Sequence, residues 1–511
     1  MKKRALISVS DKTGLVEFVS GLKNEGWEII ATGGTKTLLE KSGIETVEIS
    51  RVTGFPEICD GRVKTLHPKV HGALLALRDN PEHLKALEEN EIGFIDLVCV
   101  NLYPFRETIA NPDTTLEEAV EKIDIGGPSM LRSAAKNFPS VTVVCDPDDY
   151  AMVLGEIRQN GDTSLKTRMQ LSAKAYTHTA QYDSCIATYM RRQAGLNEKL
   201  FLEFDLKQTL RYGENPHQSA SFYASTKAVP FSLANAVQMQ GKELSYNNIQ
   251  DANAALSIVR DFSEPFCVAL KHMNPCGAGQ AATIEEAWRK AFEADPVSIY
   301  GGIVAVNRTL TEEVAREMKP IFLEIVLAPD FTPEALEILS TKKNLRVMKV
   351  DMTPSDEPVD QYVGVTGGLL VQHQDIQTEK LTEEQVVTEI KPTPEELADL
   401  QFAWNIVKHV KSNAIVVVQN LQTRGVGAGQ MNRVGSAEIA LKQATASGNA
   451  ERLVLASDGF LPFADTVELA AKYGVRSIVQ PGGSIRDAEC IAKANEENIS
   501  MLLTGVRHFK H

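Results

Sequence analysis

The sequence has no apolar run that approaches the ~20 residues of a membrane-spanning helix. Its first residues, MKKRALISVSDKTG, are basic but lack the apolar stretch of a secretory signal peptide. None of its seven cysteines has a C-x-x-C spacing with another. We therefore interpret them as reduced, mostly buried thiols, and we expect a soluble cytoplasmic protein.

The chain also has no excess of positively charged residues. The chain has 53 Lys and Arg residues against 67 Asp and Glu residues, which gives a formal net charge of −14. This balance disfavours nonspecific binding to nucleic acid or to an anionic membrane, because a phosphate surface attracts net basic protein. A small anionic substrate remains compatible, since it needs only a local cationic pocket. At about 150 residues per domain, a chain of 511 residues predicts two to four domains.

The first two hundred residues alternate β-rich runs with helical patterns. The runs RALISVS, WEIIAT, FIDLVCVNLYP and SVTVVCD are predicted strands, and TGLVEFVSGLKNEG is a predicted helix that Gly26 closes. Ser10 or Asp11 is expected to cap the start of that helix. Strands that alternate with helices predict an α/β domain with a parallel sheet. The polar segment RRQAGLNEKL at 191–200 is the predicted boundary.

The rest of the chain contains an internal repeat. FCVALKHMNPCGAG precedes the helical pattern IEEAWRKAF, and AIVVVQNLQTRGVGAG precedes SAEIALKQA. In this alignment Gly277–Gly279 corresponds to Gly427–Gly429. We predict two related α/β units, joined by an acidic, proline-bearing stretch of loop and surface helix from DMTPSDEPVDQ to IKPTPEEL.

Three places in the first half suit a phosphate group, because free backbone N–H groups gather where strands end and helices begin. They are Ser10–Gly14, Thr32–Thr35 and the turn at Gly126 and Gly127. GRVKTLHPKVHG adds the cations Arg62 and Lys64. A plain strand-to-helix turn explains any one of these, but together they predict a phosphate cradle beside a catalytic pocket. Tyr103, Asp124 and Lys136 are further candidate donors and acceptors.

A metal site is not predicted. His67 and His71 have helical spacing, but Pro68 lies between them and nearby cations would repel a metal ion. GVGAG is not the G-x-G-x-x-G of a dinucleotide site. NPCGAG lacks the second cysteine and the preceding H-x-E of a zinc deaminase.

Lys271 and His272 end an apolar strand in the second half. A neighbouring ammonium favours a neutral imidazole that can accept a proton, although an edge-of-sheet pair in water is the plain alternative. Amide, aromatic and glycine-rich segments accompany this pair, and they suit a planar heterocycle that carries a phosphate. These segments contribute Arg211, Tyr212, His217, Asn247, Asn248, Asn413, Gln430, Arg433, Phe460, Pro462, Phe463, Asp458 and Asp465.

Together these residues resemble one family over essentially the whole chain: the bifunctional purine biosynthesis proteins that combine AICAR formyltransferase with IMP cyclohydrolase. The matching stretches are SVSDKTGL, GRVKTLHPKVHG, NLYPF, DIGGPSMLRSAAKN, LRYGENPHQ, ALKHMNPCGAG, GAGQMNR, SDGFLPF and RHFKH. The resemblance implies a methylglyoxal-synthase-like cyclohydrolase domain at 1–196. It also implies a formyltransferase region at 197–511, made of two cytidine-deaminase-like units without zinc at approximately 200–370 and 395–511.

For formyl transfer from 10-formyltetrahydrofolate to AICAR, the resemblance implies catalytic roles for Lys271, His272 and Asn413. His272 stands at the position of the base, and the order of proton transfer between His272 and Lys271 stays open. Glu324 falls at an acidic position of the family in a stretch that matches poorly. The other expected substrate-binding residues are Arg211, Tyr212, Asn248, Gly301, Gln430, Arg433, Phe460 and Arg507, with Val434, Asp465, Gly482 and Gly483 on the folate side.

For ring closure to IMP, the resemblance implies an active site of Lys64, Tyr103, Asp124 and Lys136. The expected nucleotide pocket comprises Ser10, Asp11, Lys12, Thr32, Gly33, Gly34, Thr35, Arg62, Thr65, Asn101, Ile125, Gly126 and Gly127. No tightly bound cofactor is implied, because the folate is a co-substrate; the family can bind a potassium ion. A homodimer with transferase sites between its subunits is also implied.

Two other functions stay open from the residues themselves. A nucleotide-sensing regulatory protein would bind purine nucleotides without turnover, although the presence of both Lys271 and His272 weighs against it. A zinc deaminase would carry stoichiometric zinc.

Overall fold

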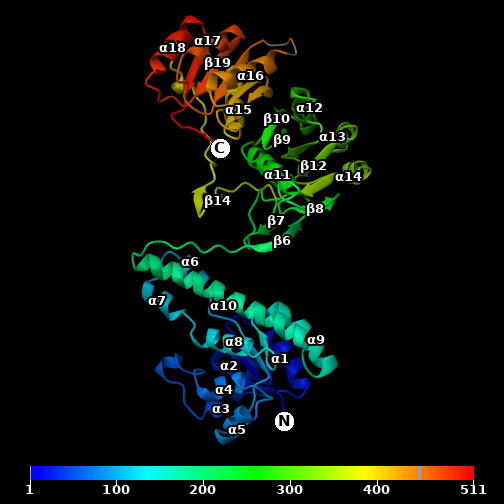
Figure 1. Cartoon of the computed structure of the whole chain (residues 1–511), viewed down its shortest axis with the longest axis vertical. Coiled ribbons are helices and arrows are strands. Elements are labelled where there is room, and N and C mark those ends of the chain that lie inside the picture. Colours follow the sequence, from blue (N-terminus) through cyan, green and yellow to red (C-terminus); the bar gives the residue numbers. More distant parts are fainter. Residues whose placement is uncertain (1, 447, 449–450) are drawn as a thin grey trace. The chain divides into compact units, whose positions relative to one another are not determined.

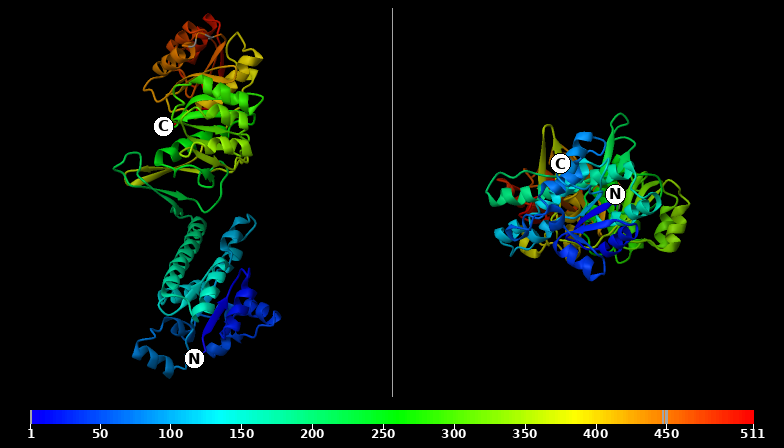
Figure 2. Two further views of the ribbon diagram at one scale, coloured as in Figure 1. Left: turned by 90° about the vertical axis from the view of Figure 1, so that its right-hand side faces the viewer. Right: turned by 90° about the horizontal axis from the view of Figure 1, so that it is seen from below.

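The computed structural model describes residues 2–446, 448 and 451–511, and it divides into two compact units. These are Met1–Glu203 and Phe204–His511, each with its own sheet and core. Figures 1 and 2 show the helices of each unit lying against its sheet. Within the described residues, no helix has the length and apolar character needed to cross a membrane.

The first unit contains a five-stranded sheet in the order β3-β2-β1-β4-β5, with every pair parallel. This confirms the predicted α/β domain with a parallel sheet. Its strands are β1 (Arg4–Ser8), β2 (Glu28–Ala31), β3 (Val47–Glu48), β4 (Leu97–Val100) and β5 (Thr142–Val144). Its helices are α1 (Leu15–Asn24), α2 (Gly33–Lys41), α3 (Ile49–Thr53), α4 (Pro68–Leu75), α5 (Pro81–Glu89), α6 (Phe105–Ala110), α7 (Leu116–Glu121), α8 (Gly126–Lys136), α9 (Tyr150–Asn160) and α10 (Leu165–Gln193).

Helix α1 shows how the apolar pattern builds this core. Leu15, Phe18, Val19 and Leu22 are buried at helical spacing, and Phe18 stacks on Tyr150 of α9 with ring centroids 4.3 Å apart. The predicted cap of α1 is wrong, because its N-cap is a glycine in the left-handed conformation and no side chain caps it. The carboxylate expected there turns back to its own loop, as Asp11 accepts from the backbone N–H of Thr13 at 2.9 Å.

The second unit is built on an eleven-stranded sheet in the order β20-β19-β18-β16-β17-β10-β9-β11-β12-β13-β8. The first half contains α11 (Tyr246–Val259), β9 (Phe266–Lys271), β10 (Asn274–Gln280), α12 (Ile284–Ala294), β11 (Gly302–Val306), α13 (Glu312–Met318), β12 (Leu323–Ala328), α14 (Pro333–Ser340) and β13 (Arg346–Lys349). The second contains α15 (Pro394–Val407), β16 (Ile415–Gln419), β17 (Gln422–Gly427), α16 (Arg433–Thr445), β18 (Leu453–Ser457), α17 (Asp465–Lys472), β19 (Val475–Gln480), α18 (Asp487–Glu496) and β20 (Ser500–Leu503).

The two halves have the same topology. The strand orders β10-β9-β11-β12-β13 and β17-β16-β18-β19-β20 correspond one to one, and the halves join where β10 pairs antiparallel with β17. Strand β8 (Val237–Gln240) adds to the outer edge of the first half. The unit therefore contains two repeats of one α/β arrangement, while any likeness of each repeat to cytidine deaminase stays a prediction.

The glycines of the repeats correspond differently from the prediction. Gly277 pairs with Ala269 in the first hairpin, as Gly425 pairs with Val417 in the second. The true partner of the Gly277–Gly279 stretch is therefore residues 425–427. A Cβ at Gly277 would lie 2.0 Å from a backbone oxygen of α12, and one at Gly425 would lie 1.9 Å from a backbone oxygen of α16. These glycines let each helix approach its strand closely.

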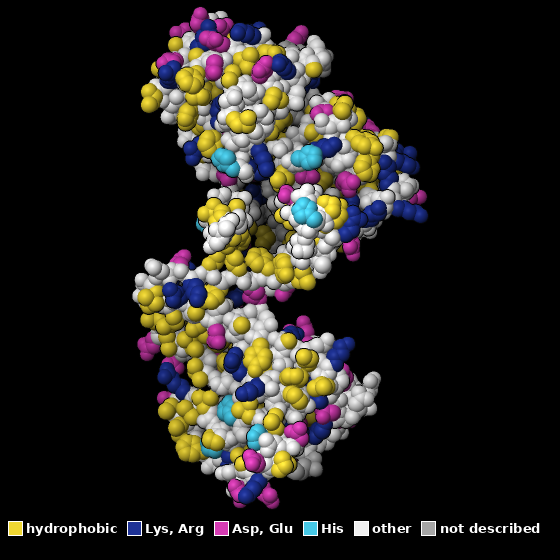
Figure 3. Space-filling view, in the orientation of Figure 1, with side chains coloured by type: hydrophobic (Ala, Val, Ile, Leu, Met, Phe, Trp, Pro, Cys, Tyr) yellow, Lys and Arg dark blue, Asp and Glu magenta, His cyan; other side chains and the backbone are white. Residues whose placement is uncertain are grey.

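The segment between the repeats also differs from the predicted loop and surface helix. It forms a hairpin of β14 (Asp360–Val365) and β15 (Gly368–His373), followed by the short helical turn η3 (Glu383–Gln385). The hairpin is exposed along its whole length and pairs with no other described strand. Hydrophobic side chains lie at the surface in this part of the unit (Figure 3). The first segment of the unit forms another pair, β6 (Asp205–Leu210) with β7 (Ala220–Ala224).

A buried ionic cluster connects the ends of α11 and α15. The carboxylate of Asp261 lies 2.8 Å from Nζ of Lys408 and 2.6 Å from Nε2 of His409. Burial lowers the pKa of His409 to about 4, although Asp261 acts in the opposite direction. Asp261 and His409 hold matching positions, since each follows its helix's N-cap, Ser245 or Thr393, by sixteen residues. The cluster thus contains equivalent residues from both repeats.

Candidate active sites

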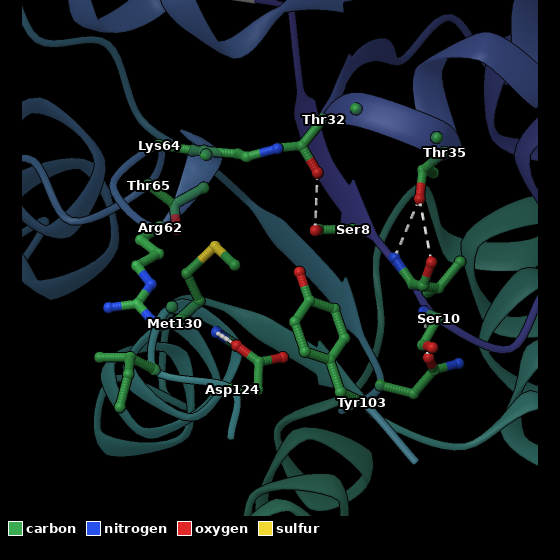
Figure 4. Close-up of a pocket in the computed structure, with 18 of the residues that line it drawn as sticks. Ser8, Ser10, Thr32, Thr35, Arg62, Lys64, Thr65, Tyr103, Asp124 and Met130 are labelled. Atoms are coloured by element: carbon green, nitrogen blue, oxygen red, sulfur yellow. Dashed lines mark hydrogen bonds between the residues drawn. The ribbon is translucent and has the colours of Figure 1, made fainter. Parts of the chain in front are cut away.

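A cavity of about 640 Å³ opens in the first unit at the carboxyl ends of its parallel strands. Open α/β sheets bind ligands at this edge, because the loops there leave a crevice between strands. Figure 4 shows residues from several loops around it. The predicted residues that line it are Ser10, Lys12, Thr32, Gly33, Gly34, Thr35, Arg62, Lys64, Thr65, Asn101, Tyr103, Asp124, Ile125, Gly126 and Gly127.

Backbone N–H groups on one side of the cavity are held by Asn101. Its Oδ1 accepts from the N–H groups of Ser10 at 2.5 Å and Asp11 at 2.9 Å, which fixes the loop after β1. Thr35 connects α2 to the same loop through its hydroxyl, 3.1 Å from the backbone oxygen of Val9. The side chain of Asp11 does not line the cavity. Asp11 therefore contributes to the site through the backbone of the loop after β1.

Arg62 and Lys64, two of the predicted cations at the cavity, each have an acidic partner that the sequence did not reveal. Lys64 Nζ lies 3.0 Å from Oε2 of Glu57, and Arg62 forms an ion pair with Glu121. Nζ of Lys64 is also 3.5 Å from where a Cβ on Gly33 would be, which places it beside the first turn of α2. A phosphate entering here meets cations whose present partners it can replace.

Asp124 is the partly buried carboxyl group of the cavity. Its Oδ1 accepts from the backbone N–H of Gly127 at 2.8 Å, while its own N–H donates to the hydroxyl of Tyr182. Burial raises the pKa of Asp124, against the hydrogen bonds it accepts from backbone N–H groups. Figure 4 shows Tyr103 pointing into the same space. A carboxyl group of raised pKa beside a phenol provides a proton donor and acceptor pair.

Lys136 is not brought to this cavity. It is the last residue of α8, whose first residue, Gly126, lines the cavity. Ten helical residues span about 15 Å, and the side chain of Lys136 is exposed. The family resemblance implied a place in this active site for Lys136, but the helix axis carries it away from the cavity.

A second cavity, of about 680 Å³, lies in the first repeat of the second unit. The predicted residues that line it are Arg211, Tyr212, Asn247, Asn248, His272, Gly301 and Glu324. Lys271 is adjacent, and its Nζ donates to the backbone oxygen of Tyr300 at 2.9 Å. Of this pair, His272 lines the cavity, whereas Lys271 does not line it and contacts the residue that precedes Gly301.

Two residues of this group have structural partners. Oδ1 of Asn248 accepts from the backbone N–H of Ser245 at 3.1 Å, so its side chain closes the capping box of α11. Glu324 lies 2.6 Å from Nη1 of Arg346, a cavity residue that sequence reasoning missed. The acidic position is thus neutralised by a neighbouring strand.

Asn413 belongs to a buried polar cluster in the second repeat. Nη2 of Arg433 donates to Oδ1 of Asn413 at 2.9 Å, and Nδ2 of Asn413 donates to the backbone oxygen of Gln430 at 2.9 Å. Arg433 also pairs with Asp458, which is fully buried. The Arg433 guanidinium therefore orients the Asn413 amide by donating to its oxygen. The sequence offered Arg433 only as a ligand of substrate.

The predicted residues of the two repeats meet at one edge of the sheet. Strand directions place the β9–β10 turn, the start of β16 and the ends of β18, β19 and β20 at the same edge. The backbone N–H of Lys411, before β16, donates to Oδ1 of Asn274 at 3.1 Å. The strands β18, β19 and β20 are followed by Phe460, Gly482, Gly483 and Arg507. The second cavity is not lined by these residues or by the other predicted residues of the second repeat, which are Asn413, Gln430, Arg433, Val434 and Asp465.

Two family models match parts of the chain. Residues 14–129 match the MGS-like domain, and residues 134–443 match the AICARFT/IMPCHase bienzyme. A bifunctional purine biosynthesis protein PurH of Streptococcus thermophilus is 57% identical over 517 residues, and that of Enterococcus faecalis is 58% identical over 513 residues. Both alignments cover 100% of each chain. The crystal structure of ForH matches 36% of this chain and 97% of its own, with 38% identity and a TM-score of 0.33.

The fold and the two clefts define an α/β enzyme with two separate sites for small anionic substrates. The chain belongs to the AICARFT/IMPCHase bienzyme family. It is accordingly a bifunctional enzyme of purine biosynthesis, with AICAR formyltransferase and IMP cyclohydrolase activities. Formyltetrahydrofolate is the co-substrate in this family.

Proposed function

We propose that the first unit closes the purine ring and that the second transfers the formyl group. The proposed bounds, 1–196 for the cyclohydrolase and 197–511 for the transferase, lie seven residues before the division between the compact units, which falls after Glu203. The first cavity carries this proposal. It combines the cations Lys12, Arg62 and Lys64, a carboxyl group of raised pKa and backbone N–H groups at strand ends. These are the groups needed to hold a ribonucleotide phosphate and to exchange protons beside it.

Ring closure joins the carboxamide nitrogen of formyl-AICAR to its formyl carbon, and water leaves. Because both reacting groups belong to one molecule, the cavity mainly selects the reactive conformer. Asp124 and Tyr103 exchange the protons, and Lys64 stabilises the oxyanion that develops on the formyl oxygen. The β1 and β2 loops hold the phosphate. Lys136 stays outside this set, because it lies at the other end of α8.

Formyl transfer joins the 5-amino nitrogen of AICAR to the formyl carbon of 10-formyltetrahydrofolate. That amine is a weak nucleophile, since its lone pair conjugates into the ring. His272 accepts the amine proton as the nitrogen attacks, and Lys271 stabilises the oxyanion or protonates the departing folate nitrogen. Asn413 holds the carboxamide of the substrate. Arg211, Tyr212, Phe460 and Arg507 bind the nucleotide, and Val434, Asp465, Gly482 and Gly483 bind the folate.

The transferase site is completed in a homodimer. The second-repeat residues share a sheet edge with Lys271, but neither they nor Lys271 line the cavity that contains His272, so one chain presents the site in separate parts. The exposed β14–β15 hairpin carries Val363, Leu370 and Val371 at 43%, 61% and 45% exposure, an apolar surface suited to a second copy. Sedimentation velocity of the full chain distinguishes a dimer from a monomer; a monomer active in transfer would refute this assembly.

The enzyme works in the cytoplasm, where its folate and nucleotide substrates are present, and potassium is the ion proposed for its transferase region. The potassium proposal depends on the family resemblance. Transferase rates measured in potassium buffer and in tetramethylammonium buffer of equal ionic strength test it, and equal rates would refute it.

The decisive experiment supplies AICAR and 10-formyltetrahydrofolate, follows the absorbance change and identifies the product as IMP. His272→Ala should lose nearly all formyl transfer but still cyclise supplied formyl-AICAR. Lys64→Ala should lose ring closure but retain formyl transfer. Lys69→Ala is the matched control, because this lysine follows the same loop but does not line the cavity. Loss of both activities in either site variant would contradict the division between units.

A further inference from the structure

The two repeats of the second unit share an unusual turn. The β9–β10 hairpin turns on His272 and Met273, with φ of 53° and 61°, and the β16–β17 hairpin turns on Asn420 and Leu421, both with φ of 55°. Two-residue turns of this kind need the left-handed conformation at both positions. Asparagine and histidine are enriched in this conformation, but methionine and leucine adopt it at a steric cost. Contacts from elsewhere must therefore hold these turns.

An aspartate from the preceding helix supplies that contact in both repeats. In the second, Asp399 of α15 accepts from the N–H groups of Asn420 at 2.9 Å and Leu421 at 2.6 Å. In the first, Asp251 of α11 accepts from the N–H of Met273 at 2.7 Å.

The two aspartates are equivalent in the fold. Asp251 follows the N-cap Ser245 by six residues, and Asp399 follows the N-cap Thr393 by six residues. Burial raises the pKa of Asp251, while the N–H of Met273 and the charge of His272 lower it. In each repeat, therefore, an aspartate at the same helical position contacts the equivalent hairpin turn.

The turns differ in what they carry. The first presents His272 to the second cavity, whose wall also includes Asp251. The second lies at the opposite edge of the sheet, where the backbone oxygen of Asn420 accepts from Lys290 at 2.9 Å and its side chain accepts from Arg452 at 2.7 Å. Because neighbouring side chains surround the Asn420–Leu421 turn, Asp399 stabilises that turn but positions no catalytic group.

We propose that Asp251 is a positioning residue for formyl transfer: its carboxylate holds the His272–Met273 turn so that the His272 imidazole faces the substrate cavity. This inference rests on the proposed role of His272 as the base. The carboxylate acts through the backbone, since its hydrogen bond is to the Met273 N–H. A ring displaced by a relaxed turn would lose alignment with the amine, and alignment is what a weak nucleophile needs most.

Asp251→Ala in the full chain tests the proposal. The kcat for formyl transfer should fall about 10- to 100-fold, as for a misplaced catalytic group, with an unchanged KM for AICAR and unchanged cyclisation of formyl-AICAR. Asp251→Asn should recover much of the rate, because its amide oxygen can accept the same hydrogen bond. In the His272→Ala background, Asp251→Ala should cause no further loss, because residues that act as one unit are not additive.

Asp399→Ala is the matched control. It removes the equivalent contact at the opposite edge, so it should lower the urea midpoint of the second unit without changing kcat of the folded enzyme. A normal kcat in Asp251→Ala, a raised KM with unchanged kcat, or additive losses in the double variant would each overturn the inference. A normal rate in His272→Ala would overturn the proposed base itself, whereas an inactive His272→Ala beside a fully active Asp251→Ala would overturn only this inference.

Discussion

Replacing Arg433 by methionine separates a structural role from direct substrate binding. The Arg433 guanidinium pairs with Asp458 and donates to Ser457 and Asn413, and Arg433 is only 7% exposed. Methionine retains much of the apolar length but provides no donor. Asp458, which is fully buried, would keep only the hydroxyl of Ser412 at 2.5 Å and a backbone N–H.

The expected cost is large because a buried carboxylate would lose its counterion. Breaking one partner of a buried pair costs about 3–5 kcal/mol, which corresponds to a change of about 10²- to 10⁴-fold in the folded-to-unfolded ratio. Formyl transfer should fall as well, since the Asn413 amide loses the donor that orients it. Ring closure in the first unit should be unaffected.

Urea denaturation followed by tryptophan fluorescence measures this cost. Trp288 and Trp404 are buried in the second unit and Trp27 is buried in the first, so a Trp27→Phe background reports on the second unit alone. If Arg433→Met lowers the free energy of unfolding by less than about 1 kcal/mol but raises KM for AICAR sharply, the reasoning is wrong and Arg433 is a substrate ligand.

Two further predictions concern the repeats and the C-terminal segment. Gly425→Ala should destabilise the second unit by about 1–3 kcal/mol or more in urea, because its Cβ would lie 1.9 Å from a backbone oxygen; Gly364→Ala, in open space, is the control and should change little. His508 lies 2.6 Å from Asp375 and 2.7 Å from Glu379; burial acts to lower its pKa, but the two carboxylates outweigh burial and raise it above 6.5. Its contribution to stability should therefore be present at pH 6 and lost as pH rises through the raised pKa, and a His508→Gln variant should lack this decline; equal pH profiles would contradict it.

Much of the fold could be predicted because its signals are local. Buried strands such as LVCV of β4 and the spacing of Leu15, Phe18, Val19 and Leu22 in α1 depend on residues a few positions apart. The duplication was visible because both repeats keep a strand, a glycine-rich stretch and a helix in order. Its alignment was wrong by two residues, since only the ladder pairing shows that Gly277 corresponds to Gly425.

The candidate sites were predicted in part. The loops after β1 and β2 line the first cavity as expected, because strand ends and glycine turns are readable in sequence. The ion pair between Lys64 and Glu57 was not predicted, because both residues lie in an irregular loop with no periodic pattern. Lys136 was assigned to this site by the family resemblance, but the length of α8 separates it from Gly126 in space.

By itself the sequence determined the strands, the helices, the glycine turns and the set of polar residues that stand at strand ends, because hydrophobic periodicity and turn chemistry act over short distances along the chain. Only the tertiary structure decided which of these groups meet: Arg433 with Asp458 and Asn413, Asp251 with Met273, and Lys271 on the same sheet edge as Asn413. Those contacts depend on strand order and helix packing. A charge or an amide gains a fixed role only when burial removes water and leaves one particular partner within reach.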